Sequence, residues 1–418
     1  MKLNKVKLGE VLDVKRGTSL AGKYYDVSGD KIRLTLGNFN YPRGGFKLNT
    51  SKKDVYFNGP VKDEFVLQKG DVITPLTEQV RGLLGETARI PKSNIFVQSG
   101  DIGLLVPNEE KIDKSFMYHL FSSDLIKEQL SKGAQQTKIR HTSPDKIKNC
   151  IAWLPELDIQ RKIGNFLDNI DQEITNNNFI SKELELMAKT IYDYWFLQYE
   201  FPDENGKPYK SNGGKMVWNE QLKQEIPVGW KVDNLYKIAD FINGIACQKY
   251  RPLDNKHKLP VIKITEMHDG FTSKTEFVRD SISKDHIINN GDILFSWSAS
   301  LETMIWNYGK GGLNQHIFKV IPKNGFSLHY VYQTLSSYIV NFKRMAEARK
   351  TTMGHITQDH LKQSRIVIPP QDLINKFENI VKKIYVEITT VDEESQQLKY
   401  LRDFLLPMLM NGQVSIKD

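Results

Sequence analysis

The feature of this sequence that most constrains its fold is a long internal repeat. Residues 116–191 align with residues 330–405 at a constant offset of 214 positions, without a gap. Identical residues in this alignment include three pairs: Tyr118 and Tyr332, His141 and His355, and Pro155 and Pro369. A repeat of this length predicts that the chain contains two copies of one structural unit.

Upstream of residue 116 the match continues more weakly, and its offset changes. The matched residues are Gly70-Asp71 with Gly291-Asp292 at an offset of 221, and Asp13 and Gly17 with Asp240 and Gly244 at 227. Because the offset falls along the chain, the second copy has shorter loops than the first. We therefore expect each copy to have a variable front and a constrained back.

The front of each copy is predicted to be a mixed α+β unit. Short apolar runs around turns, as in 65–74 and 287–295, are typical of strands. Apolar residues that recur every three or four positions predict helices at 115–131 and 328–346.

The back of each copy is predicted to be one long helix, because apolar residues recur there every seven positions as in a coiled coil. The seam residues are Ile163, Ile170, Asn177, Leu184 and Ile191 in the first copy, and Phe377, Ile384, Val391, Leu398 and Leu405 in the second. Five successive heptads favour a spacer rod of about 40 residues, roughly 60 Å long, over an ordinary buried helix. The polar Asn177 either fixes the register from a buried position or lies in an exposed kink.

These patterns divide the chain into five segments. Pro202 is expected to stop the first helix, and Pro407 to interrupt the end of the second. The expected segments are a globular domain at 1–154, a helix at 155–201, a connector at 202–229, a second globular domain at 230–368, and a helix with the C-terminal tail at 369–418.

The composition is that of a globular protein, and the usual catalytic motifs are missing. Hydrophobic residues make up 39% of the 418, and the formal charge of +8 is compatible with nucleic acid binding but does not prove it. Two distant cysteines fit a reducing cytosol, and we expect no membrane span and no signal peptide. The sequence lacks a phosphate-binding loop, an HExxH zinc motif, a nucleophile elbow and the Asn/Asp-Pro-Pro-aromatic motif of an adenine methyltransferase. We therefore expect no catalytic residue and no metal site.

A polar, basic stretch precedes the long helix in each copy. Its candidate DNA-binding residues are Gln135, Gln136, Lys138, Arg140 and His141 in the first copy, and Arg344, Arg349, Lys350, Thr351, Thr352 and His355 in the second. Basic groups contact phosphates, while amides, hydroxyls and arginine can contact base edges. One such stretch alone would favour a solvated charged face, but its recurrence at the same place favours binding.

Further candidates lie in loops that mix basic, amide and aromatic groups. They are Lys15, Arg16, Thr18, Asn38, Tyr41, Arg43, Gln79, Arg81, Lys249, Tyr250, Arg251 and Trp297. For each of these residues, a role in a turn or in the core is at least as good an interpretation.

Several motifs together resemble the specificity subunit of a type I restriction–modification enzyme, over nearly the whole chain. Two of them open the long helices: Leu154-Pro155 with Asp158-Ile159-Gln160, and Ile368-Pro369-Pro370-Gln371-Asp372. The others are the connector from Gly206 to Trp230, Gly291-Asp292-Ile293-Leu294 and Asn314-Gln315-His316. The first copy departs from the last motif, because Val97-Gln98-Ser99-Gly100 occupies the comparable place.

The resemblance implies an α+β fold with two similar target-recognition domains, separated by a pair of long antiparallel helices and related by a pseudo-two-fold repeat. It implies a non-catalytic, cytoplasmic chain that binds double-stranded DNA, two methyltransferase subunits and motor-nuclease subunits. S-adenosylmethionine, ATP and magnesium would belong to those partners, and none of these cofactors to this chain. Because the two fronts differ in sequence, the bipartite target should be asymmetric, with several unread base pairs set by the helices and half-site centres about one turn apart.

Two other functions stay open. The heptads also suit a coiled-coil scaffold whose fronts bind proteins rather than DNA. A self-contained DNA enzyme is the third hypothesis, and the missing motifs argue against it.

Overall fold

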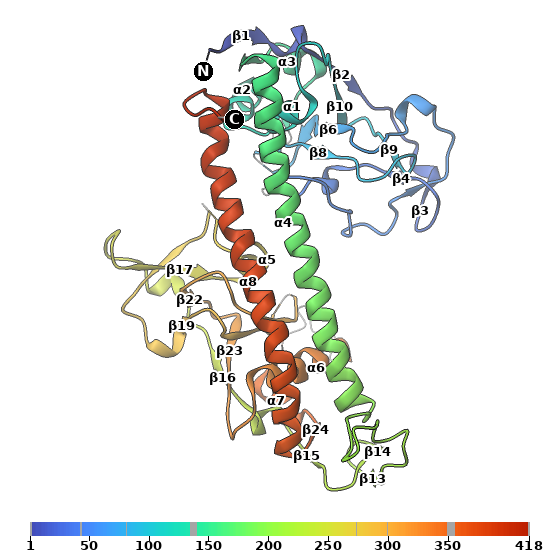
Figure 1. The fold of residues 1–418 in the computed structure, drawn as a ribbon, viewed down its shortest axis with the longest axis vertical. Coiled ribbons are helices and arrows are strands. Elements are labelled where there is room, and N and C mark those ends of the chain that lie inside the picture. The colour runs from blue at the N-terminus through green and yellow to red at the C-terminus, as the bar shows by residue number, and fades with distance from the viewer. Residues whose placement is uncertain are drawn as a thin grey trace. The chain divides into compact units, whose positions relative to one another are not determined.

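The structure is a computed structural model that divides into two compact units (Figure 1). It describes residues 2–41, 44–80, 82–133, 140–272, 274–298, 300–348 and 356–416, with the backbone alone for residues 133 and 346–348. The first unit combines residues 1–175 with 397–418, and the second consists of residues 176–396. Each unit therefore contains part of both long helices.

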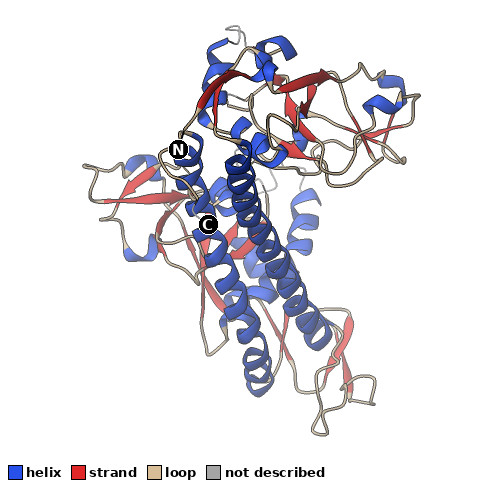
Figure 2. Cartoon of the chain, turned by 45° about the horizontal axis from the view of Figure 1, so that its top comes forward, coloured by secondary structure: helices blue, strands red, loops and turns tan. Residues whose placement is uncertain are grey.

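The first unit has an α+β fold built on short strands (Figure 2). Its strands are β1 (Asn4–Lys7), β2 (Leu12–Arg16), β3 (Tyr25–Asp26), β4 (Ile32–Arg33), β5 (Tyr56–Phe57), β6 (Val72–Pro75), β7 (Thr77–Glu78), β8 (Ala88–Arg89), β9 (Phe96–Val97), β10 (Ile102–Pro107), β11 (Arg140–His141) and β12 (Ile151–Leu154). Its helices are α1 (Lys114–Phe121), α2 (Asp124–Gly133), α3 (Pro144–Lys148), the first half of α4 (Leu157–Tyr192) and the end of α8 (Gln371–Met410).

The second unit has the same kind of fold. Its strands are β13 (Met216–Asn219), β14 (Gln224–Pro227), β15 (Lys231–Asp233), β16 (Ala239–Asn243), β17 (Lys258–Ile262), β18 (Phe277–Arg279), β19 (Ile287–Ile288), β20 (Ile293–Ser296), β21 (Glu302–Ile305), β22 (Gly311–Leu313), β23 (Ile317–Pro322) and β24 (Ile366–Ile368). Its own helices are α5 (Ile264–Asp269), α6 (Leu328–Ala348) and α7 (Gln358–Gln363), beside the second half of α4 and most of α8.

The sheets of the two units correspond in topology, completely in one sheet and over three strands in the other, which confirms the α+β fold with an internal repeat. The strand order β2-β10-β6-β8 in the first unit corresponds to β16-β23-β20-β21 in the second. In the other sheet of each unit the order β5-β4-β9 corresponds to β18-β17-β22, because the parallel pair β4-β9 matches the parallel pair β17-β22, while β3 and β19 extend opposite edges. The first strand of each copy also pairs with the strand that precedes the long helix, as β1-β12 and β15-β24.

The turns before β6 and β20 confirm the repeat at the offset of 221. Gly70 and Gly291 have φ angles of 86° and 89°, a left-handed conformation that glycine adopts without steric cost. The neighbouring Asp71 and Asp292 each accept a 2.8 Å hydrogen bond from the backbone N–H three residues earlier. The same turn therefore opens the central strand of both sheets.

A second pair of glycines confirms the offset of 227. A Cβ atom on Gly17 would lie 2.3 Å from the carbonyl oxygen of Ser99, and one on Gly244 would lie 2.1 Å from that of Asn314. No side chain fits such a close approach of two backbones. Because Ser99 and Asn314 make the same contact with these glycines, they are equivalent residues. The motif Val97-Gln98-Ser99-Gly100 of the first copy therefore aligns with Asn314-Gln315-His316 of the second through Ser99 and Asn314.

The two long helices run antiparallel within each unit. In the first unit Asp171 of α4 binds Arg402 of α8 at 2.8 Å, while Leu167, one turn earlier, shares a core with Leu409. In the second unit Asn177 donates a 3.0 Å hydrogen bond to Glu394, and the Tyr192 ring lies 6.0 Å from that of Phe377. Residues further along α4 contact residues nearer to the start of α8, so the two helices are antiparallel in each unit.

The seam residues differ between the two helices. In α4, Ile163, Ile170 and Asn177 are buried and Leu184 and Ile191 are half-buried. Asn177 is thus buried between the helices, and α4 continues through it as one helix from Leu157 to Tyr192.

In α8 Phe377 is fully buried, as are Val381 and Ile388 at the second seam position that the heptads also predict, while Ile384, Val391, Leu398 and Leu405 are half-buried. The deepest line runs through this second position, from Ile374 through Val381 and Ile388 to Ser395. The apolar residues of α8 cover more than one face of the helix, and the face that contains Ile374, Val381 and Ile388 is the most deeply buried.

The predicted effects of Pro202 and Pro407 on the long helices are wrong. The first helix ends at Tyr192 and continues as a π-helical turn, Asp193–Leu197, well before Pro202. Tyr199 has a φ of 63°, which a helix cannot accommodate. Pro407 lies inside α8, which runs on to Met410.

Candidate nucleic-acid interface

The two basic stretches return to the fold at equivalent places. The Thr142 N–H donates to the Leu76 carbonyl at 2.9 Å, and the Ile356 N–H donates to the Trp297 carbonyl at 3.0 Å. Leu76 and Trp297 follow β6 and β20 directly. The basic stretch of each copy therefore ends beside the end of the central strand.

Ten predicted residues lie outside the described part of the chain: Arg43, Arg81, Gln135, Gln136, Lys138, Arg349, Lys350, Thr351, Thr352 and His355.

At this strand end the first unit carries a polar group of four residues, which we call the first strand-end cluster: Arg16, Thr77, Asp101 and His141. The Thr77 hydroxyl donates to the Asp101 carboxylate at 3.0 Å and lies 3.2 Å from His141 Nδ1. Arg16 Nε donates to the Gly100 carbonyl at 2.8 Å. Arg16, Asp101 and His141 are exposed, so a cation, an anion and an imidazole face solvent together.

The second strand-end cluster consists of Asn243, Trp297, Gln315 and His316. Trp297 Nε1 donates to the Asn243 side chain at 3.2 Å, and the Trp297 and His316 rings lie 5.6 Å apart. Gln315 Nε2 lies 3.3 Å from His316 Nε2. The other ring nitrogen of His316 is buried and has no hydrogen-bond partner among the described residues. A buried nitrogen of this kind is costly unless a ligand or water satisfies it.

The two clusters occupy corresponding positions but differ in chemistry. The strand pairings show that Arg16 in the first copy is equivalent to Asn243 in the second, and that Asp101 is equivalent to His316. The first cluster is charged, whereas the second presents an amide, an indole and an imidazole. Two surfaces with one backbone frame and different side chains suit recognition of two different partners or sequences.

Arg140 has a structural contact that its sequence pattern did not predict. Its guanidinium lies 3.4 Å from Glu78 and 3.1 Å from the Ser131 hydroxyl. Glu78 is buried and also accepts the backbone N–H groups of Gly82 and Leu84. Arg140 thus balances a buried carboxylate that shapes the loop after β7.

We expect Arg140→Ala to lower the free energy of unfolding by about 2 kcal/mol, because it leaves a buried carboxylate without its cation. Urea denaturation of the full chain measures this, and the exposed Lys132→Ala serves as the control, with an effect below about 0.5 kcal/mol. Equal effects of the two changes would contradict the structural role. If Arg140→Ala also weakens DNA binding, this loss of stability is a second explanation beside the loss of a DNA contact.

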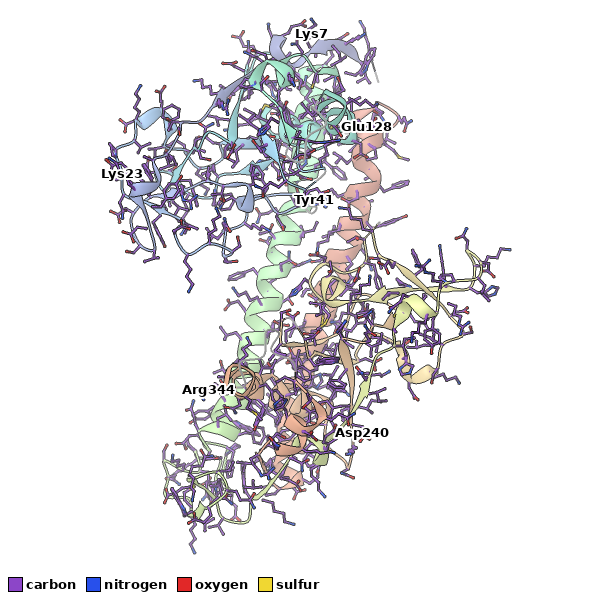
Figure 3. The ribbon with its side chains drawn as sticks, turned by 180° about the vertical axis from the view of Figure 1, so that it is seen from behind. Lys7, Lys23, Tyr41, Glu128, Asp240 and Arg344 are labelled. Atoms are coloured by element: carbon purple, nitrogen blue, oxygen red, sulfur yellow. The ribbon has the colours of Figure 1, made fainter. Side chains whose placement is uncertain are left out.

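The remaining predicted residues are scattered over the surface. Lys15, Gln79, Lys249, Arg251 and Arg344 are exposed, and Thr18, Tyr41 and Tyr250 are half-buried. Figure 3 labels Tyr41 and, on α6, Arg344. No described hydrogen bond joins these residues to either strand-end cluster.

Asn38 is fully buried, and its amide has structural partners. The oxygen accepts the Thr35 N–H at 2.8 Å, and the nitrogen donates to the Lys47 carbonyl at 3.1 Å. An amide used in this way is not available to a base edge. The sequence pattern could not reveal this, because an asparagine that caps a turn and one that binds DNA look alike.

The sequence patterns did not predict five residues of the strand-end clusters as candidates. Thr77, Asp101 and Asn243 were not among the candidates, and Gln315 and His316 entered only as part of a motif. Alignment of the two copies strand by strand would have found them. Among the described residues no group of three or more metal-ligating side chains is close enough to hold a metal ion. No helix in the described ranges is long and apolar enough to cross a membrane.

A sequence profile of the type I restriction modification DNA specificity domain matches residues 2–186 and 227–399. The chain belongs to this family. The two matched segments correspond to the two copies of the repeat, so each copy is one specificity domain. Specificity subunits are not catalytic themselves, and the reactions of the enzyme belong to their partner subunits.

Relatives of this specificity-domain chain are divergent in sequence. The MjaIX specificity subunit of Methanocaldococcus jannaschii is 22% identical over 327 residues, which is 75% of this chain and 72% of that protein. The HindI specificity subunit of Haemophilus influenzae is 20% identical, covering 85% of this chain and 89% of that protein. A crystal structure of a specificity subunit from M. genitalium matches 98% of this chain and 96% of that chain with a TM-score of 0.56 at 15% identity, a likeness of fold.

Proposed function

We propose that this chain is the DNA-recognition subunit of a type I restriction–modification complex and reads an asymmetric, bipartite DNA sequence. The observation that carries the proposal is the pair of strand-end clusters, which share a backbone frame and differ in side chains. Each cluster contacts one half-site, with the adjacent basic stretch on the phosphates. Unlike clusters make the two half-sites unlike.

The long helices supply the spacing between the half-sites. At 1.5 Å per residue, the 36 residues of α4 and 40 of α8 are about 54 and 60 Å long. A stiff helix pair of fixed length keeps several base pairs between the half-sites unread.

The partner subunits have two candidate docking surfaces, which are related by the repeat. On α4, within the second unit, Leu186 and Met187 are 56% and 53% exposed. Their equivalents at the offset of 214, Tyr400 and Leu401 on α8 within the first unit, are 73% and 41% exposed. Exposed apolar groups of this size mark protein contacts. Two equivalent surfaces suit two copies of one partner, a methyltransferase subunit.

The catalytic chemistry belongs to partners in this proposal. The methyltransferase subunits bind S-adenosylmethionine, and motor-nuclease subunits use ATP and magnesium. The chain itself contributes only DNA recognition and assembly.

The test is to sequence methylated adenines in DNA from cells that carry the complete system. We expect one asymmetric motif with two short recognised parts and an unread gap. A continuous palindromic motif, or no motif, would overturn the proposal. Salt titration of the assembled complex on this duplex separates it from a protein scaffold, because phosphate contacts make log K fall linearly with log salt concentration.

Changes in one cluster should alter one half of the motif. We expect Asn243→Ala and His316→Ala to reduce discrimination at one half-site by about 1–3 kcal/mol per contacted base pair. Arg16→Ala and Asp101→Ala should do the same at the other half-site and leave the first intact.

Binding to a panel of singly substituted duplexes measures these effects, and the exposed Lys237→Ala is the control. A change of preference in both halves from a single cluster would contradict the assignment.

A further inference from the structure

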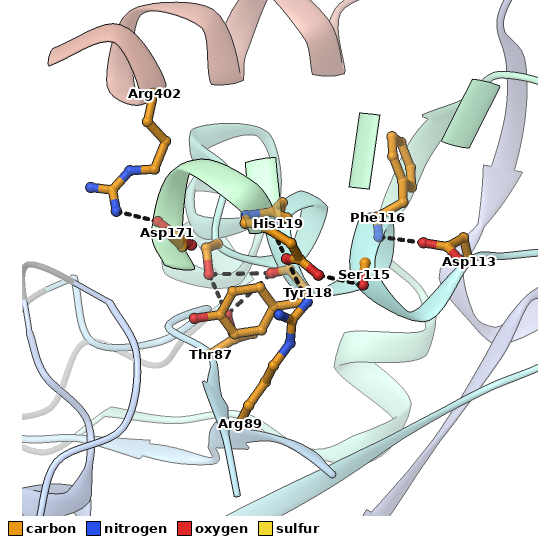
Figure 4. Close-up of polar contacts among 11 residues, drawn as sticks. Thr87, Arg89, Asp113, Ser115, Phe116, Tyr118, His119, Asp171 and Arg402 are labelled. Atoms are coloured by element: carbon orange, nitrogen blue, oxygen red, sulfur yellow. Dashed lines mark hydrogen bonds and ion pairs between the residues drawn. The ribbon is translucent and has the colours of Figure 1, made fainter. Parts of the chain in front are cut away.

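The first unit contains two histidines, and they differ in how the chain uses their ring nitrogens. His119 is buried, and its Nε2 lies 2.8 Å from the Asp168 carboxylate inside the fold (Figure 4). His141 of the first strand-end cluster is exposed, and its Nδ1 lies 3.2 Å from the Thr77 hydroxyl. Among the described residues no group binds Nε2 of His141, so this nitrogen is available to a ligand.

The register of two short strands holds His141 against Thr77. In the antiparallel pair of β7 and β11, His141 lies opposite Thr77 and Arg140 lies opposite Glu78. Residues opposite each other in such a pair have their side chains on the same face of the sheet, and the next pair uses the other face. On that other face the Arg140 guanidinium lies 3.4 Å from Glu78. The backbone pairing and this ion pair together fix where the imidazole lies.

The hydrogen bonds of Thr77 determine which nitrogen of an uncharged His141 carries the hydrogen. An ionised carboxylate only accepts hydrogen bonds, so the single hydroxyl hydrogen of Thr77 is donated to Asp101, at 3.0 Å. The Thr77 oxygen can then only accept a hydrogen bond from His141, which places the hydrogen on Nδ1. Because an uncharged imidazole has one N–H group, Nε2 is left as a hydrogen-bond acceptor.

The groups beside the ring suit the edge of a base. Arg16 donates from Nε to the backbone carbonyl of Gly100 at 2.8 Å, which leaves the terminal nitrogens of its guanidinium as donors to a ligand. Asp101 is exposed and is an acceptor. The cluster therefore offers arginine donors together with acceptors on Asp101 and His141, and bases present both kinds of partner in the major groove.

We propose that His141 is a specificity-determining residue, whose Nε2 accepts a hydrogen bond from the amino group of one adenine or cytosine in the half-site of the first cluster. In the major groove adenine N6 and cytosine N4 are donors, whereas guanine O6 and thymine O4 are acceptors. An acceptor on the protein therefore selects amino bases and excludes keto bases. Thr77 is the positioning residue that fixes the tautomer. The tautomer stands on the geometry of this chain, and only the base contact rests on the proposed function.

The repeat keeps part of this arrangement in the second copy. At the offset of 221 the hydroxyl recurs as Ser298, and at 214 the histidine recurs as His355, which lies outside the described residues. The carboxylate is not kept, because His316 is equivalent to Asp101. The position of the hydrogen is therefore assigned in the first copy alone, and the discrimination is expected at one half-site.

The first experiment observes the tautomer in the full chain by heteronuclear NMR of the histidine side chains, at the pH of the DNA-binding assays. Comparison with His141→Phe identifies the His141 signals. We expect the hydrogen on Nδ1 and an unprotonated Nε2. Thr77→Val should lose this single form, because the hydroxyl that binds Nδ1 is gone, whereas Thr77→Ser should keep it. A wild-type ring with hydrogen on Nε2, alone or together with Nδ1, overturns the proposal.

The second experiment measures binding of the assembled complex to duplexes of the methylated motif in which one base pair is exchanged. We expect one adenine or cytosine whose replacement by guanine or thymine lowers wild-type affinity about tenfold or more. The analogue of that base without its amino group should lower affinity in the same way. His141→Phe, which keeps a ring of similar size without the acceptor, should remove this discrimination at that position and leave it intact at the others.

Controls separate a base contact from other causes. Lys237→Ala should keep the discrimination, and Thr77→Val compared with Thr77→Ser gives the same test should His141→Phe not fold. An equal loss of affinity for every duplex in His141→Phe would indicate a phosphate contact and overturn the base contact, as would unchanged discrimination. Failure of the proposed function would appear separately, as the absence of a bipartite methylation motif.

Discussion

A chain with seven residues added to both long helices, beside Asn177 in α4 and Glu394 in α8, should no longer recognise the wild-type DNA sequence. One heptad lengthens each helix by about 10.5 Å and returns its faces to within about 20°. The helix pair therefore still packs, but the added length corresponds to about three base pairs of DNA. Over that distance the duplex turns by nearly a third of a turn, so the second half-site faces away.

We expect affinity for the wild-type duplex to fall by about three orders of magnitude, toward non-specific binding. The measurement is titration of the assembled complex with duplexes whose unread gap is unchanged or longer by two to four base pairs. As the control, seven residues inserted in the exposed turn between β13 and β14 leave both helices at their natural length and should leave recognition intact. Unchanged affinity in the helix variant would contradict a spacing role for the helices.

Asp168→Ala should destabilise the first unit by about 3 kcal/mol, the largest effect of a single substitution that we expect on stability. His119 at 2.8 Å, Ser115 at 2.6 Å and Arg89 at 2.8 Å all bind this one carboxylate. Denaturant unfolding of the full chain measures the change. The control is Lys382→Ala at the equivalent position of the second unit, where an exposed side chain should contribute less than about 0.5 kcal/mol. An equally small effect of Asp168→Ala would contradict this.

The same carboxylate predicts how stability depends on pH. Burial opposes ionisation of Asp168, but hydrogen bonds from His119, Arg89 and Ser115 outweigh it and lower the pKa to about 2. Because this folded-state pKa is below the ordinary value of 3.8, the stabilisation is complete above about pH 5 and is lost as the pH falls toward 2. In Asp168→Asn, the free energy of unfolding should no longer include the decrease between about pH 5 and pH 2 that ionisation of Asp168 causes in the wild-type chain.

The sequence repeat allowed much of the fold to be predicted, because a constant offset requires the same backbone path in both copies. Gly17 and Gly244 illustrate this, since each is needed where two backbones meet. The seam of α8 was less predictable. Its apolar residues cover more than one face, and only packing against α4 decides that Ile374 and Val381 lie deeper than Ile384.

The candidate binding surface was harder to predict than the fold. Thr77, Asp101 and His141 are brought together by strand pairing, and nothing in their spacing along the chain indicates it. Arg140 was predicted from its charge, but a buried glutamate 62 positions away is its contact. Contacts between distant segments depend on register, and one sequence reveals register only where the repeat is strong.

The composition of the two units has a consequence for biosynthesis. The second unit is continuous along the chain, at 176–396, so all its parts have been synthesised before residues 397–418 are added. The first unit still lacks Leu409 and Met410, which are buried in its core, until the chain has been synthesised past residue 410. The half of the protein that the ribosome makes first is thus the half that matures last. A nascent chain that stops before residue 397 leaves that older half with an exposed apolar face, a substrate for chaperones and proteases.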